Sequence, residues 1–300
     1  MSHYASTVLR VRRGLVCAAL AVAALTAAGC SSGGAKSQSS VRQGVADPGP
    51  EHVHGLGINP KDGALFVATH TGLFRAAANE QRTSRIGDRF QDTMGFTIVG
   101  ADRFLGSGHP DLRDKLPPFL GLIRSDDAGR SWDPVSLSGK ADFHVLEAQG
   151  GHVYGFGSDW DTRTEQLLVS RDGGRRWKER ASPESLIALA IRPGRPNTII
   201  ASGQEGLHFS TNGGTSWQPV EGPPGLLAWP TPGRLYVLGS DGMAHVSADA
   251  GHSWRKLGNA GGEPAAFEAA GPRDLYAALH DGTINYSTDA GITWRVRARP

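Results

Sequence analysis

Short apolar segments separated by polar turns fill residues 51–300, and they recur in a fixed order. An apolar segment such as Val53–Ile58 or Leu186–Ile191 is followed by a turn and then by a second segment of seven residues. Runs of this length, rich in branched and aromatic residues, predict β-strands. The second segment occurs six times, and its copies end at His70, His109, Ser158, Gln204, Ser240 and His280. The pattern therefore predicts six repeats that each begin with a pair of adjacent strands.

A second repeat of eight residues follows five of these strand pairs. Its form is Ser-x-Asp-x-Gly-x-Ser/Thr-Trp, with Arg176 in place of the hydroxyl residue in one copy and Asn212 in place of Asp in another. Successive copies start 45, 40, 37 and 40 residues apart, and a period of about 40 residues is typical of a four-stranded propeller blade. The copies span Ser125–Trp132, Ser170–Trp177, Ser210–Trp217, Ser247–Trp254 and Ser287–Trp294.

The residue types in this repeat are those of a self-sufficient turn between two strands. Asp127 can accept hydrogen bonds from N–H groups of its own turn, Gly129 can adopt a positive φ, and Trp132 can cover the turn with apolar surface. Asn212 keeps the turn-forming ability of the aspartate it replaces. The repeat thus predicts a structural element joining the third and fourth strands of a blade, and it carries no sign of catalysis.

Together the two repeats predict an all-β fold, a six-bladed β-propeller with four antiparallel strands in each blade and five of the eight-residue turns. The first blade lacks the turn; its third strand is expected at Gly72–Arg75 and its fourth at Arg82–Ile86. The sequence leaves open how the ring closes, because no exchange of a strand between the first and last blades is evident.

The N-terminal residues have the pattern of an export signal. Arg10, Arg12 and Arg13 precede an apolar run of 15 residues, Gly14–Ala28, which is short for a membrane span. The run ends in Leu-Thr-Ala-Ala-Gly-Cys, which resembles a bacterial lipobox with Cys30 as the lipidated residue. We expect a signal peptide at 1–29, a flexible tether at 30–50 and the propeller at 51–300. The alternative is cleavage by an ordinary signal peptidase, with Cys30 unmodified.

The cysteine content and the net charge limit the kinds of partner that the sequence predicts. Cys17 is lost with the signal peptide and Cys30 would be acylated, so no disulfide is expected in the domain. Removal of the signal leaves 28 basic and 29 acidic residues, and no basic patch predicts nucleic acid as a partner. The expected location is the extracytoplasmic side of the cell membrane, held there by lipid. A metal ion, a glycan and an envelope protein remain as candidate partners.

The predicted strand order assigns functional residues to one face. Strands alternate in direction, so the starts of the first strands lie on the face opposite the eight-residue turns. Histidine and methionine there favour a Cu or Zn site at the channel mouth. The alternatives are a site for another polar ligand, or histidines that bond only to backbone and water. The candidate metal ligands are His52, His54, His70, Met94, His109, His144 and His280.

Two long loops, Pro110–Leu120 and Asp159–Gln166, extend from the same face and predict walls of a site. Trp160 could stack on a sugar or pack on its neighbour. Arg113 and Arg163 could bind a carboxylate, although solvated loop charge is the simpler interpretation. The candidate residues for a ligand other than a metal are Asp92, Asp159, Trp160, Gln204, Glu205, Asp241 and Asp281.

The eight-residue turns resemble the Asp box, or BNR repeat, of the sialidase superfamily, and His52–Arg75 resembles bacterial envelope proteins loosely named glycosyl hydrolases. The resemblance implies a sialidase-like fold, but the Arg-Ile-Pro motif of sialidases is missing. Sialidases also use a tyrosine nucleophile at the channel mouth, whereas all the tyrosines of the domain fall inside strands: Tyr154, Tyr236, Tyr276 and Tyr286. Asp-box propellers also include non-catalytic assembly factors, such as the photosystem II type.

Two classes of function follow from the sequence. The first is a binding module with a ligand, Cu or Zn among them, at the histidine-rich mouth. The alternative is a glycoside hydrolase acting on extracellular glycans. Its catalytic carboxylates would come from Asp159, Asp161, Glu205, Asp241 and Asp281.

Overall fold

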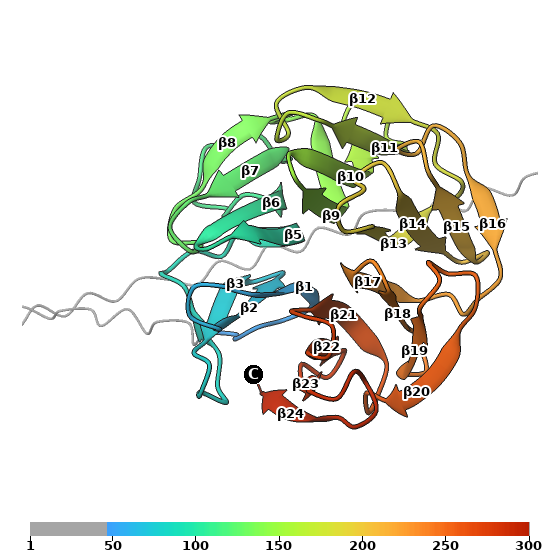
Figure 1. Cartoon of the computed structure of the whole chain (residues 1–300). Helices are drawn as coiled ribbons and strands as arrows, with labels where there is room; N and C mark the ends of the chain where they lie inside the picture. Colours follow the sequence, from blue (N-terminus) through green and yellow to red (C-terminus); the bar gives the residue numbers. More distant parts are fainter. Residues whose placement is uncertain (1–46, 300) are drawn as a thin grey trace, which may run out of the picture. The chain divides into compact units, whose positions relative to one another are not determined.

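Every strand and turn of the computed structural model, which describes residues 47–299, belongs to a β-propeller (Figure 1). Six antiparallel sheets of four strands surround a central channel, as predicted. No helix in this part of the chain is long and apolar enough to cross a membrane. The predicted signal peptide and Cys30 lie outside the described residues.

The strands of each blade follow one another in the chain. Blade 1 contains β1 (Val53–Ile58), β2 (Leu65–Thr69), β3 (Gly72–Ala76) and β4 (Ser84–Arg85), and blade 2 contains β5 (Asp92–Gly100), β6 (Arg103–His109), β7 (Leu122–Ser125) and β8 (Asp133–Ser136). Blade 3 contains β9 (Ala141–Gln149), β10 (His152–Asp159), β11 (Glu165–Ser170) and β12 (Trp177–Arg180), and blade 4 contains β13 (Leu186–Ile191), β14 (Ile199–Gly203), β15 (Leu207–Ser210) and β16 (Gln218–Val220). Blade 5 contains β17 (Leu226–Thr231), β18 (Arg234–Leu238), β19 (Met243–Ser247) and β20 (Arg255–Asn259), and blade 6 contains β21 (Pro264–Ala269), β22 (Leu275–Leu279), β23 (Ile284–Ser287) and β24 (Arg295–Ala298).

The first strand of each blade lines the channel, and these strands contact one another in a closed cycle: β1, β5, β9, β13, β17 and β21. The second strands are almost wholly buried, whereas the fourth strands are largely exposed. Apolar side chains therefore lie between adjacent blades, where each sheet packs its face against the next. This arrangement fixes the inner strand ends rigidly around the two channel openings.

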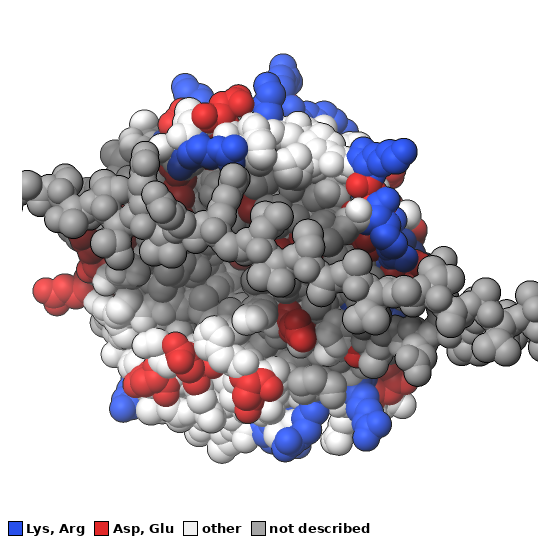
Figure 2. All heavy atoms as spheres, turned by 180° about the vertical axis from the view of Figure 1, so that it is seen from behind, with Lys and Arg blue, Asp and Glu red and all other residues white. Residues whose placement is uncertain are grey.

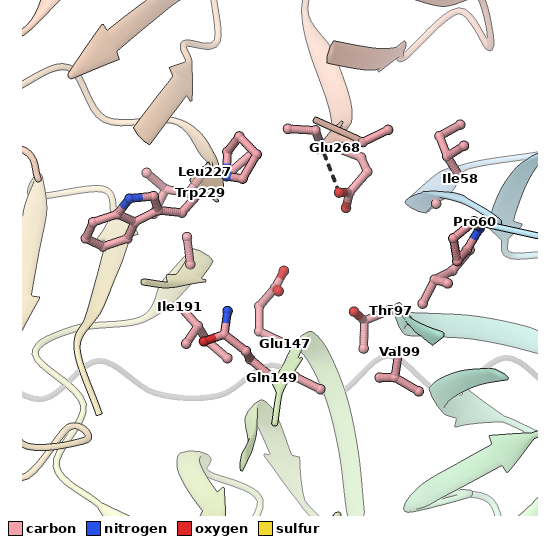
Figure 3. A pocket seen from close by; sticks show the side chains of 18 of the residues that line it. Ile58, Pro60, Thr97, Val99, Glu147, Gln149, Ile191, Leu227, Trp229 and Glu268 are labelled. Atoms are coloured by element: carbon pink, nitrogen blue, oxygen red, sulfur yellow. Dashed lines mark hydrogen bonds between the residues drawn. The ribbon is translucent and has the colours of Figure 1, made fainter. Parts of the chain in front are cut away.

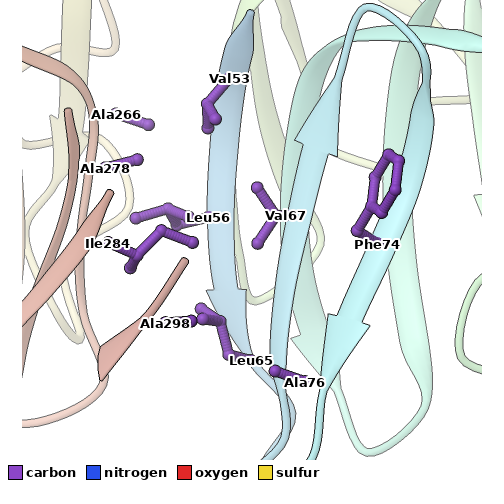
Figure 4. Packing of buried hydrophobic residues seen from close by; sticks show 10 residues of the cluster. All are labelled: Val53, Leu56, Leu65, Val67, Phe74, Ala76, Ala266, Ala278, Ile284 and Ala298. Carbon is purple, nitrogen blue, oxygen red and sulfur yellow. The ribbon is translucent and has the colours of Figure 1, made fainter. Parts of the chain in front are cut away.

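The ring closes between blades 6 and 1 by packing and by a short bridge. Leu56 and Val67 of blade 1 belong to one apolar cluster with Ala278 and Ile284 of blade 6 (Figure 4). The predicted fourth strand of blade 1 is confirmed, since β4 lies within residues 82–86. Each sheet takes its strands from one continuous segment, and closure uses a single parallel bridge between residues 82 and 299.

The Arg297 guanidinium strengthens this closure. It is largely buried and donates to the carbonyls of Ala77, at 2.7 Å, and of Glu80. Residues 47–50, which the sequence placed in the tether, also contact blade 1, where the Arg85 Nε donates to the Asp47 carboxylate at 3.0 Å. Residues 47–50 are therefore attached to the first blade.

The eight-residue turns have the predicted internal hydrogen bonds. In the fourth copy, Gly251 N donates to the Ser247 hydroxyl at 2.7 Å, and that hydroxyl donates to Asp249 at 2.7 Å. The same carboxylate accepts the backbone N–H of Ser253 at 2.8 Å and its hydroxyl at 2.6 Å. Asn212 makes the corresponding bonds in the third copy. The turn is therefore held by its own residues.

Three of the five turns also bond their blade to the preceding blade through the tryptophan side chain. The indole N–H groups of Trp177, Trp217 and Trp254 donate to oxygens at or just after the fourth strand of the preceding blade, at 2.8, 2.8 and 3.2 Å. Gly174 has φ of +86°, and a Cβ there would lie 2.0 Å from Leu122 of blade 2. The glycine is thus needed both for the turn and for the close approach of the neighbouring blade.

Candidate metal site at the channel mouth

A β-bulge near the start of the inner strand recurs in five of the six blades. The ladder with the second strand skips one residue in each, and the skipped residues are His54, Met94, His144, Ile187 and Ala265. A bulge turns its extra side chain out of the ladder. All five residues line one cavity of about 300 Å³ at the mouth, together with His52, Val53 and His280. The bulges therefore bring residues from five blades into one site.

The most compact cluster of potential ligands joins blades 1 and 2. His54 and His70 of blade 1 and Asp92 of blade 2 offer ligand atoms that all lie within 4.8 Å of one another. His70 Nδ1 lies 2.9 Å from Oδ2 of Asp92, and His54 Nε2 lies 3.6 Å from its Oδ1. Two ligands about 2.1 Å from a tetrahedral zinc would lie about 3.4 Å apart. The distances between the ligand atoms of this cluster are therefore close to those expected around a bound zinc ion.

Two atoms of this cluster are buried without a partner. Within residues 47–299, neither His54 Nε2 nor Asp92 Oδ1 has a hydrogen-bond partner. Burial, followed by the nearby rings of His70, His144 and His52, lowers the pKa of His54 to about 4. The imidazole is therefore neutral at neutral pH, as a metal ligand must be. Burial also raises the pKa of Asp92, so a cation between these groups would offset an unfavourable charge.

A second cluster joins blades 2 and 3 and centres on Asp142, which the sequence analysis missed. Its buried Oδ2 lies 3.1 Å from His144 Nε2 and 3.4 Å from His109 Nε2. The hydrogen bond to Asp142 raises the pKa of His144. Asp142 stands at the start of its inner strand as Asp92 does, since Asp92 pairs with His109 and Asp142 with Ser158. Alignment of the inner strands by their bulges would have found it.

The remaining predicted metal ligands lie around the same opening. His52, Met94 and His280 line the mouth cavity, and the His52 ring packs edge-on to His70 with centroids 6.1 Å apart. All seven residues predicted as metal ligands thus occur at or beside the mouth. His70 and His109 lie beside the cavity, where they contact Asp92 and Asp142 respectively.

The predicted carboxylates of the loops serve turns instead. Asp159 accepts from Thr162 N at 2.7 Å and from Gln166, and these turn hydrogen bonds lower its pKa. Asp241 and Asp281 each accept from the backbone N–H two residues further on, at 2.9 and 2.8 Å. In the described chain the mouth cavity is lined by none of these three, nor by Gln204 or Glu205.

Trp160 packs against its neighbours in the two long loops. Its ring meets Phe119 edge-on, with centroids 5.1 Å apart, and Arg163 lies 4.0 Å over its face. Phe119 in turn lies 5.6 Å from the His109 ring. The two loops therefore form an aromatic wall beside the second cluster, and Arg163 already covers one face of the indole that a sugar would use.

The channel continues to a second cavity, of about 380 Å³, at the end where the inner strands finish (Figure 3). Glu147 of blade 3 and Glu268 of blade 6 point into it from opposite sides. Burial raises the pKa of both, that of Glu268 to about 7, and the nearby Glu268 raises that of Glu147 further. The residues at the corresponding position of the other blades are small: Gly57, Thr97, Ala190 and Ala228.

The two ends of the channel communicate. A narrower cavity of about 120 Å³ is lined both by His54 and His144 and by Glu147 and Glu268. Outside the channel, basic and acidic side chains are interspersed around the rim of the face shown in Figure 2.

Comparison with known proteins gives the fold. No family model and no curated protein matches the chain. Among solved structures, a GH74 enzyme of Niastella koreensis matches with a TM-score of 0.58 and 14% identity, over 84% of this chain and 46% of that one. YCF48 from Cyanidioschyzon merolae matches with 0.50 and 16%, over 83% and 85%. A luciferin-regenerating enzyme matches with 0.54 and 13%, over 85% and 95%. The chain spans less than half the length of the GH74 enzymes it matches.

Proposed function

We propose that this propeller is a binding protein whose channel mouth takes up a Cu or Zn ion through His54, His70 and Asp92. The observation that carries the proposal is the pair of buried atoms, His54 Nε2 and Asp92 Oδ1, which face each other at 3.6 Å without hydrogen-bond partners among residues 47–299. Buried polar atoms without partners are costly, and a metal ion would serve both. Imidazole nitrogen with one carboxylate is a donor set that suits Zn and Cu.

The surroundings of the cluster support the same assignment. His52 and His280 line the cavity next to it and can add imidazole ligands, and the thioether of Met94 is a soft donor that favours copper. The cavity of about 300 Å³ leaves room for water or a small ligand on the ion. An ion in this place would be open to exchange from the channel mouth.

Metal content of the purified chain tests the proposal. We expect Cu or Zn in the protein as isolated, and tight Zn²⁺ binding by calorimetry after chelator treatment. A His54→Ala/His109→Ala double variant should bind at least tenfold more weakly, because it removes a ligand from each cluster. His252→Ala, which changes an exposed histidine of an eight-residue turn, is the control and should bind as the wild type. Equal weak binding by all three proteins would refute the proposal.

We further propose that Cys30 carries lipid and holds the domain at the extracytoplasmic side of the cell membrane, where its partner is a metal ion, a glycan or an envelope protein. The support is the export pattern and the lipobox-like sequence before Cys30. Cys30→Ala should leave the protein unprocessed or release it from the membrane fraction. A variant that fractionates with the membrane at the processed size would contradict this.

One observation favours a second candidate, glycoside hydrolysis. Such enzymes pair a carboxylic acid of raised pKa with a second carboxyl group, and Glu268 and Glu147 oppose each other in the channel. Under this candidate the chain would release reducing sugar from xyloglucan or a sialoside, and Glu268→Gln would abolish the release. No release by the wild type would remove the candidate and leave metal binding unaffected.

A further inference from the structure

The two histidine–aspartate clusters share one pairing, which is repeated one blade further along the chain. In each, a histidine at the end of the second strand meets an aspartate at the start of the next blade's first strand: His70 with Asp92, and His109 with Asp142. Both aspartates are buried, and in each the Oδ1 atom lacks a hydrogen-bond partner within residues 47–299. Each cluster also has one bulge histidine, but from a different side of the pair: His54 belongs to the blade of His70, and His144 belongs to the blade of Asp142.

We infer that the mouth binds a second metal ion, at Asp142, His109 and His144, one blade further round the channel than the first. This inference rests on the proposed function, because it extends metal binding at the same mouth. It assigns a ligand role to Asp142 and a stoichiometry of two ions per chain.

The hydrogen bonding of His109 points to a cation at this place. Its Nδ1 lies 2.8 Å from the carbonyl oxygen of Pro118, which can only accept, so Nδ1 carries the hydrogen. In the neutral ring, Nε2 then presents a lone pair, and it faces a carboxylate oxygen of Asp142 at 3.4 Å. Two acceptors in this position are stabilised by a cation between them, which is either a metal ion or a proton on Nε2. A backbone carbonyl that fixes the ring in this way is also the usual support of a metal-binding histidine.

The distances from both histidines to the shared carboxylate suit an ion. Among residues 47–299, however, only the first cluster has three ligand atoms that all lie within 4.8 Å of one another, so binding of the second ion requires the half-exposed His144 to turn towards His109. The separations of His109 Nε2 and His144 Nε2 from Asp142 Oδ2, 3.4 and 3.1 Å, lie near the value of about 3.4 Å expected for two ligands of one tetrahedral ion. The second site differs from the first because His144 already donates to Asp142 and is half exposed. An ion must displace that hydrogen, so we expect the second ion to bind more weakly than the first.

Titration of the metal-free full chain with Zn²⁺, followed by calorimetry and native mass spectrometry, tests the stoichiometry. We expect two ions in the wild type, the second bound at least tenfold more weakly. Asp142→Asn should abolish the weaker event and leave the tighter one unchanged, and Asp92→Asn should abolish the tighter one. His144→Gln changes a more exposed side chain and gives the same test if Asp142→Asn misfolds. Asp161→Asn, an exposed carboxylate of the same face, is the matched control.

The outcomes separate this inference from the proposed function. Two ions lost one at a time by the two aspartate variants would establish both. A single ion, unaffected by Asp142→Asn and His144→Gln and lost in Asp92→Asn, would overturn the second site and keep the first. A single ion lost in both aspartate variants would mean one shared site and would also overturn the inference. No ion in the wild type, with His109 carrying both ring protons by nuclear magnetic resonance, would overturn metal binding altogether.

Discussion

Aspartates stand at both ends of the blades, and the two ends use them in opposite ways. At the eight-residue turns the carboxylate of Asp249 accepts hydrogen bonds from Ser253 and Ser247, which lower its pKa. At the channel mouth, Asp92 is buried with one oxygen unpartnered in the described chain, and burial raises its pKa. The same side chain thus has all its hydrogen-bond partners at one face and lacks one at the other, where under the proposed function a metal ion supplies it.

The contrast between the two faces can be tested first at the turns, where a substitution is expected to have the largest effect on stability. Trp254 packs with the core between blades 4 and 5, and its indole N–H donates to the Glu221 carbonyl. Because the ring is half-buried, Trp254→Ala should lower the free energy of unfolding by about 2 kcal/mol, less than the full cost of a buried tryptophan. Denaturant unfolding measures the loss. Zn²⁺ affinity of the folded variant should not change, and a variant with wild-type stability but no zinc binding would reverse the roles assigned to the two faces.

The carboxyl groups inside the channel provide a second test of this contrast. Folding raises their pKa, whereas it lowers the pKa of the aspartates in the eight-residue turns. Burial raises the pKa of Glu268 to about 7 from an ordinary value of 4.5, so the folded state holds this proton more tightly than the unfolded state. Its contribution to stability is present below pH 4.5 and is lost as the pH rises towards 7. A shift of this size corresponds to at most about 3 kcal/mol, and the partial exposure of the Glu268 side chain reduces it to about 1–2 kcal/mol.

Glu268→Gln should therefore be more stable than the wild type at pH 8 and should lose this advantage at pH 4.5. Thermal unfolding at the two pH values measures the difference. Glu263→Gln, an exposed position just before the same strand, is the control. An equal effect of Glu268→Gln at both pH values would show that the carboxyl group is not held protonated by the fold.

The turn aspartates should show the reverse pH dependence, with a smaller effect for each residue. Hydrogen bonds within the turn lower the pKa of Asp249 and Asp289 below the ordinary value of 3.8. Their contribution to stability is present above pH 3.8 and is lost as the pH falls further. Asp249→Ala should lower the melting temperature at pH 7, and the difference from wild type should shrink below pH 3. Asp249→Asn should be nearly neutral, since Asn212 already makes the same bonds in its own turn.

The parts of this molecule that were predictable from sequence are those held by short-range contacts. The turn at Ser125–Trp132 is closed by hydrogen bonds that span at most four residues, so its repeat alone indicated the blades. The fourth strand of blade 1 was predicted because it follows its hairpin directly. The histidines of the mouth were predicted from strand order, which places the starts of all inner strands at one opening.

The features that were missed depend on contacts between distant segments. Asp142 became recognisable only when the bulges aligned the inner strands and placed it beside His109 of the neighbouring blade. Glu147 and Glu268 are separated by more than a hundred residues and meet only because their blades oppose each other across the channel. Closure by Arg297 likewise joins the last strand to the first blade. No local pattern of residue types predicts these long-range contacts.

A matched pair of alanine variants tests the central claim most directly. Asp92→Ala removes a carboxylate of the mouth, and Asp249→Ala removes one of the turns. Each variant is stripped of metal, titrated with Zn²⁺ and melted at pH 7. The account predicts that Asp92→Ala loses the tight zinc-binding event and keeps the melting temperature, whereas Asp249→Ala lowers the melting temperature and keeps zinc binding. Zinc affinity that is unchanged in Asp92→Ala, or reduced equally in both variants, would contradict it.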